Sequence, residues 1–173
     1  MDPLTIALRF FHIVGGALWV GSAFLFIVYI GPAAAKVGPS SGPLLSEVVK
    51  KRRVGWAFNA LIASNVIAGW WLWLRNVEGY GSVGAFVATD FGLVLTIGGL
   101  LATTAGVLGF LGTGRSVERL VELGDTVRAS GGPPSDQQQA ELARLGANVR
   151  TYGLITLALL ILAISAMATA RYW

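Results

Sequence analysis

The hydrophobic positions of this chain gather into four long runs that are separated by polar, charged or glycine-rich segments. The runs cover about residues 4–30, 55–74, 91–112 and 152–170. Each run is close to the roughly 20 apolar residues that an α-helix needs to cross the hydrocarbon core of a bilayer. The pattern predicts an all-α fold in which four helices form an integral membrane bundle.

The polar segment between the third and fourth runs, about residues 113–150, has a helical pattern of its own. Apolar residues recur at helical spacing over 117–127, and the glycines and prolines of 131–134 break the pattern. Ser135 followed by Gln138 fits a capping box, and no helix breaker follows before the C terminus. We expect a helical hairpin that extends the third and fourth helices beyond the membrane.

The composition agrees with a membrane location. Of the 173 residues, 54% are hydrophobic and 13% are charged, and the mean hydropathy is +0.66. An ordinary soluble domain carries about 25% charged residues. Asp2 stands where a signal peptide would have a basic leader, so we expect the first run to be a retained span. Residues 1–173 should form a single transmembrane domain.

Basic residues predict how the bundle is oriented. Five of the 13 Lys and Arg residues lie between the first and second runs, and five lie in the hairpin. The other three, Arg9, Arg75 and Arg171, lie near helix ends. Because short basic loops stay in the cytoplasm, both termini should face outward. The net charge of +4 then serves contact with anionic lipid headgroups, and we expect no nucleic-acid partner.

His12, which is the only histidine of the sequence, lies inside the first apolar run. Ionisable groups within a membrane are costly and are therefore candidates for function. A neutral imidazole ligates iron or copper, and helix bundles hold haem through inward-facing histidines. The alternative is a buried histidine that only donates a hydrogen bond to a nearby carbonyl group.

Arginines near His12 suit the two propionate groups of a haem. Arg9 lies on the same helical face as His12, about 4.5 Å nearer the outer surface. Arg75, Asp90 and Arg171 should lie at a similar level on the other helices, so a polar ring at the outer end of the bundle is expected. Arginine binds carboxylates through bidentate, charge-assisted hydrogen bonds.

A second axial ligand is less obvious, because the sequence has no other histidine and no cysteine. Met167 should lie near the depth of His12, which would allow a His/Met pair. The other solutions are an open sixth position on the iron and two protomers that contribute one histidine each. Met167 is better explained as an apolar side chain that fills space in the bundle.

Small residues indicate where helices approach one another. Gly98, Ala102 and Gly106 lie four residues apart on the third span, and Ala17 and Gly21 do so on the first. This spacing lets membrane helices pack closely, either within the bundle or at a dimer seam.

Polar and aromatic residues of the second span suggest further contacts. Asn59 and Asn65 are expected to form interhelical hydrogen bonds, or to support a ligand at His12. Trp70, Trp71 and Trp73 lie at the outer boundary, where an aromatic belt is expected for most of them. They cannot share one helical face, so at least one should face lipid.

The segment LRFFHIVGGALWVGSAFLFIVYIGP resembles the first helix of bacterial membrane proteins in the copper-resistance protein D-like superfamily, which includes the haem-associated protoporphyrinogen oxidases. The matching residues are His12, Trp19 and Gly21. The resemblance implies a four-helix protein of the bacterial cytoplasmic membrane. From the oxidase branch it implies a haem ligand at His12, and Trp19 becomes a candidate cofactor-binding residue.

The resemblance departs from the oxidases at the start of the third span. The oxidases carry a lysine there, whereas this chain has Thr89, Asp90 and Phe91. The departure argues against protoporphyrinogen as the substrate.

The sequence therefore predicts a membrane protein that holds haem b near the outer leaflet through His12, with Arg9 and either Arg171 or Arg75 on the propionates. Its role would be redox, with a redox partner and a homo-oligomer as expected partners. An open iron site would bind a substrate or a diatomic ligand, whereas a six-coordinate iron would favour electron transfer.

The alternative hypothesis is a non-enzymatic scaffold or copper-handling module in which His12 is structural. Copper is a less favoured candidate than haem iron, because Cu(I) prefers several Met, His or Cys ligands. The sequence offers one histidine, two methionines and no cysteine.

Overall fold

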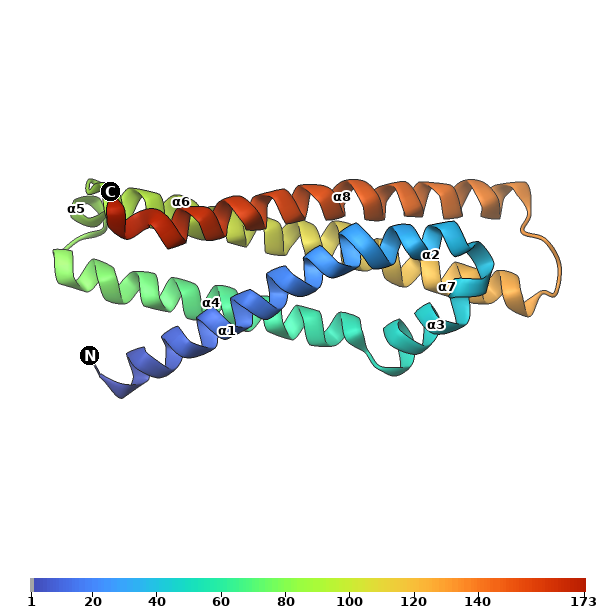
Figure 1. Ribbon diagram of the computed structural model, residues 1–173, viewed down its shortest axis with the longest axis horizontal. Helices are drawn as coiled ribbons and strands as arrows, with labels where there is room; N and C mark the ends of the chain where they lie inside the picture. The colour runs from blue at the N-terminus through green and yellow to red at the C-terminus, as the bar shows by residue number, and fades with distance from the viewer. Residues whose placement is uncertain (1) are drawn as a thin grey trace.

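The computed structural model describes residues 2–173, and this part of the chain folds into helices without any strand. Over the same residues, four helical segments are long and apolar enough to cross a membrane. They run side by side along the long axis of the molecule (Figure 1). The predicted all-α class and the predicted number of long apolar helices are confirmed.

The first long helix begins at a well-capped N terminus. It is α1 (Pro3–Phe24), and Asp2 is its N-cap residue. The Asp2 carboxylate accepts hydrogen bonds from the backbone N–H and the hydroxyl of Thr5, both at 2.8 Å. Pro3, at the first position of the helix, supplies the φ angle that a helix start requires and lacks an N–H that would go unbonded there.

The first helix continues beyond the predicted end of the span through a π-helical turn. This turn, η1 (Leu25–Ile30), leads directly into α2 (Gly31–Val37). The N–H of Gly31 bonds to the carbonyl of Phe26, five residues earlier. The wider turn accommodates the ring of Pro32, which would otherwise clash with the preceding turn of an α-helix.

The prolines and glycines of the connector to the second long helix predict an irregular segment that leads into a short helix, whereas the structure is helical from Gly31 to Lys51. Gly38, with φ 69°, turns the chain. Pro39 and Pro43 each lie at the start of a short helix, where a missing N–H costs little. Arg53, with φ 51°, ends the connector. The short helical segments are η2 (Gly38–Ser41), α3 (Gly42–Ser46) and η3 (Glu47–Lys51).

The third and fourth long helices form a long antiparallel hairpin. The capping box of Ser135 and Gln138 is present, as predicted. The third long helix runs without interruption from α6 through η4 into α7 and packs along the fourth, α8 (Figure 1). The remaining elements of the chain are α4 (Val54–Tyr80), α5 (Val83–Val87), α6 (Asp90–Leu108), η4 (Gly109–Gly114), α7 (Arg115–Ala129), α8 (Asp136–Thr169) and η5 (Ala170–Tyr172).

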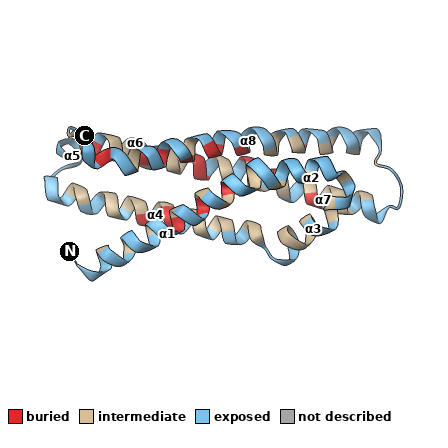
Figure 2. Ribbon diagram, in the orientation of Figure 1, coloured by how far each residue is buried: buried red, intermediate tan, exposed pale blue. Residues whose placement is uncertain are grey.

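The first helix leans across the other three. At Gly15 and His12 it contacts α4, and its far end contacts α8, where Ile27 lies against Gly153. The buried residues gather where these helices cross (Figure 2). Both ends of the chain lie at the same end of the molecule (Figure 1).

Glycines of α6 bring the helices close together, as their spacing predicted. A Cβ atom added at Gly98 would lie 2.9 Å from Met167 Cγ, and one at Gly106 would lie 3.0 Å from Ile62 Cγ2. Gly21 of α1 behaves differently, because a Cβ there would meet nothing within 4 Å. The small-residue stripe of α1 is therefore not a contact within this chain.

Two of the tryptophans predicted to form a belt instead join α4 to α6. The indole N–H of Trp70 donates to the Thr103 hydroxyl at 2.9 Å, and that of Trp73 donates to Thr96 at 2.8 Å. Trp71 is 49% exposed and faces outward, as at least one of the three had to do.

Candidate functional site

His12 and Asn65 form a reciprocal pair of hydrogen bonds where α1 crosses α4. The Nδ1 atom of His12 lies 3.0 Å from the backbone carbonyl oxygen of Asn65. The side-chain amide of Asn65 donates to the backbone carbonyl of His12 at 2.8 Å. Asn65 is buried and His12 is half-buried. The predicted interhelical role of Asn65 is confirmed, and its partner is the candidate ligand itself.

This pairing defines the protonation of the imidazole. A carbonyl oxygen only accepts hydrogen bonds, so the proton of a neutral His12 lies on Nδ1. The lone pair then lies on Nε2. Metal-ligating histidines in proteins commonly donate their other ring N–H to a carbonyl or carboxylate in the same way, which fixes the ring and its tautomer. An imidazole held in this way fits the role of a single protein ligand to a haem iron.

Two glycines make room for the pair. A Cβ atom at Gly69 would lie 2.7 Å from Cε1 of His12, and one at Gly15 would lie 3.0 Å from the Asn65 amide nitrogen. The imidazole therefore rests against the bare backbone of α4. Gly69 was not predicted to belong to the site, although a glycine one turn after Asn65 in an apolar helix was a usable signal.

Arg75, which is a candidate partner for a haem propionate, forms ion pairs with acidic side chains in the structure. Its guanidinium lies 2.7 Å from the Asp2 carboxylate and 3.2 Å from that of Glu78. The hydrogen bonds from Thr5 and then from Arg75 lower the pKa of Asp2 to about 2. A propionate at Arg75 would have to share the guanidinium with these carboxylates.

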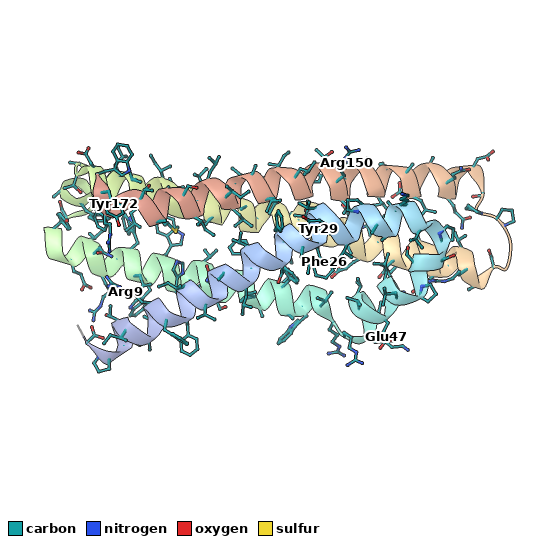
Figure 3. The ribbon with its side chains drawn as sticks, viewed as in Figure 1. Arg9, Phe26, Tyr29, Glu47, Arg150 and Tyr172 are labelled. Carbon is teal, nitrogen blue, oxygen red and sulfur yellow. The ribbon has the colours of Figure 1, made fainter. Side chains whose placement is uncertain are left out.

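The other members of the predicted polar ring lie at the same end of the molecule. Arg9 is exposed on α1, one turn before His12, and Figure 3 shows it on a different helix from Tyr172. The guanidinium of Arg171 lies 4.9 Å from the centre of the Tyr172 ring and donates to its hydroxyl at 3.0 Å. Asp90 is the first residue of α6.

Met167 and Trp19 both fill space between helices. Met167 is half-buried and packs against Gly98 of α6. Trp19 is 3% exposed and packs in a cluster with Ala23, Ala105 and Leu160. These contacts match the space-filling alternative for Met167, whereas His12 packs against α4.

A metal site built from protein ligands alone is not found in the part of the chain that the structure describes. Over residues 2–173, no three His, Asp or Glu side chains come together as a metal-binding group. Haem places a smaller demand on the protein, because the porphyrin supplies four nitrogen ligands and the chain adds one or two axial ligands.

The fold defines the general class to which this chain belongs, which is helical proteins with apolar helices long enough to cross a membrane. Comparisons with protein-family models, with curated proteins and with solved structures found no match. The function therefore has to be argued from the residues around His12.

Proposed function

We propose that this chain is an integral membrane haem protein with a redox role, in which Nε2 of His12 is an axial ligand to the iron. The observation that carries the proposal is the hydrogen bond from His12 Nδ1 to the Asn65 carbonyl. It orients the ring and keeps the proton of the neutral imidazole away from Nε2. The resemblance of the first helix to the haem-associated oxidases supports the same role.

The long apolar helices would cross the bacterial cytoplasmic membrane, with both termini outside and the α7–α8 hairpin inside. Because both basic segments would then be cytoplasmic, this orientation satisfies the positive-inside rule. His12 would lie about 4.5 Å deeper than Arg9, so Arg9 is the arginine best placed for a propionate.

When bound, haem would supply the one-electron redox chemistry. The chain would hold the cofactor through His12, while the carbonyl of Asn65 keeps the imidazole in place. Arg9 would neutralise propionate charge near the outer surface. Met167 would not hold the cofactor, because it is packed against α6, so any second protein ligand would be a histidine from another copy.

The proposal is tested by absorption spectra of the detergent-purified protein in its oxidised and dithionite-reduced forms. We expect a Soret band in the wild-type protein and in the Asn65→Ala variant, which keeps the backbone carbonyl that accepts from His12. We expect the His12→Ala variant to lose the band. A wild-type protein that stays colourless after haem is added back would refute haem binding.

A second candidate function is a structural membrane scaffold or metal-handling module, in which His12 only joins two helices. The reciprocal nature of the His12–Asn65 bonds favours it. This alternative predicts a colourless protein in which His12→Ala and Asn65→Ala lower thermal stability by similar amounts. If His12 is a haem ligand, the Asn65→Ala variant should keep the Soret band and the His12→Ala variant should lose it.

A further inference from the structure

A cavity of about 340 Å³ opens between α8 and the junction of η4 with α7. Most of its lining residues belong to α7, α8 and η4, and α7 and the start of α8 lie in the half of the molecule away from the chain termini (Figure 1). Its lining changes character along its length. Leu108 and Tyr152 lie in its apolar part, and Arg115, Arg119, Arg144 and Asn148 lie in its polar part.

The polar part of this cavity carries an excess of positive charge. Three guanidinium groups line it, and the carboxylate that pairs there is Glu141, which accepts two hydrogen bonds from Arg144 at 2.7 and 2.6 Å. Glu118 belongs to the opposite side of α7, because its carboxylate lies 3.1 Å from the Cβ position of Gly55 on α4.

Two of these arginines lie one turn apart on the same helix, and the guanidinium of Arg115 lies 5.5 Å from the centre of the Phe110 ring. Arg115 and Arg119 lie four residues apart on α7 and both line the cavity. Like charges at this spacing repel and destabilise a helix, unless an anion lies between them. Guanidinium groups bind phosphate oxygens through paired hydrogen bonds, and Asn148 adds an amide donor from α8.

The cavity also lies at a level that suits a lipid. Leu108 and Tyr152 belong to the apolar runs that we expect to lie in the membrane, whereas the arginines begin one turn beyond the end of the third run. A phospholipid at this boundary would place its phosphate among the arginines and its acyl chains beside Leu108. Basic pockets between helices at the cytoplasmic face of a membrane bind anionic headgroups.

We propose that the Arg115–Arg119–Arg144 cavity is a specific binding site for the phosphate headgroup of an anionic phospholipid. The proposal rests on the membrane insertion proposed above and does not depend on haem. Lipid binding should therefore persist in the His12→Ala variant, so the failure of one proposal would leave the other standing.

The test is native mass spectrometry of the full-length protein with added phosphatidylglycerol, phosphatidylcholine or inorganic phosphate. We expect the wild-type protein to retain phosphatidylglycerol in preference to phosphatidylcholine. The double variant Arg115→Gln/Arg119→Gln should bind phosphatidylglycerol roughly tenfold more weakly. Circular dichroism and gel filtration of the double variant show whether it is folded.

The matched control is Arg150→Gln, which removes an equally basic side chain from α8. Arg150 does not line the cavity, and Figure 3 shows it on the side of α8 away from α7. This variant should bind phosphatidylglycerol like the wild-type protein. An equal loss in both variants would mean general attraction to surface charge and would overturn the proposal. So would a wild-type protein that binds inorganic phosphate as well as it binds the lipid.

Discussion

At the scale of single residues, haem binding would depend on how the imidazole of His12 is held. Its orientation comes from a backbone carbonyl of α4, and its space comes from the missing side chain of Gly69. The spacing of Arg9 and His12 predicted that they share a helical face. No local pattern predicted which carbonyl group His12 would meet, because that depends on how α1 crosses α4.

A methyl group added at position 69, as in the Gly69→Ala variant, should disturb the imidazole of His12. The added Cβ would lie 2.7 Å from Cε1 of His12, so the ring must move and its bond to Asn65 should weaken. Alanine gains about 1 kcal/mol of helix propensity, but overpacking costs roughly 1–3 kcal/mol. We expect a lower unfolding temperature in detergent and, if haem is bound, an altered Soret band.

The control for this variant is Gly79→Ala on the same helix, where a Cβ meets nothing within 4 Å. We expect Gly79→Ala to keep or raise the unfolding temperature and to leave the spectrum unchanged. Equal behaviour of the two variants would show that the imidazole does not need the space at Gly69.

At the scale of elements, the sequence predicts a structural feature correctly where the interacting residues are close together in the sequence. The capping box of Ser135 and Gln138 is an example. The prolines of the connector predicted an irregular segment before a short helix, but this segment is also helical, because prolines break a helix in its interior and fit its first positions. The hydrogen bonds of Trp70 and Trp73 could not be predicted from local pattern, because their partners, Thr103 and Thr96, lie on another helix.

The start of α1 predicts a dependence on pH. The pKa of Asp2 falls from 3.8 to about 2 in the folded protein because Thr5 and Arg75 bind its carboxylate. A lowered pKa in the folded state stabilises the fold at pH values above 3.8, and this contribution disappears as the pH falls through about 2. The effect should be modest and weakened by salt, since the group is exposed.

The Asp2→Asn variant isolates this contribution, because asparagine also caps a helix but carries no charge. We expect the wild-type protein to unfold at a higher temperature than the variant near neutral pH, and the difference to vanish near pH 2. A difference that stays constant over this range would rule out the charge of Asp2 as its cause.

At the scale of the whole molecule, an even number of spans requires both ends of the chain to lie together. The apolar runs predicted this arrangement, and both termini lie at the same end of the molecule (Figure 1). Which end is outside follows only from the placement of basic residues. The tilt of α1 was not predictable, because it depends on which glycines and large side chains meet across helices.

Single-cysteine labelling tests the orientation, because the natural sequence has no cysteine. Tyr172 is 74% exposed, and a Cβ at Gly132 would meet nothing within 4 Å, so both positions tolerate the change. We expect Tyr172→Cys to react with a membrane-impermeant maleimide in intact spheroplasts. Gly132→Cys should react only after the membrane is permeabilised, and the reverse result would invert the proposed topology.

The most direct measurement of the central claim is the amount of haem per protein chain in purified wild-type protein and in the His12→Ala variant. We predict bound haem in the wild-type protein and its loss in the variant, while the folded state persists by circular dichroism. Equal haem content in both proteins, or none in either after haem is added, would contradict the assignment of His12 as an axial ligand.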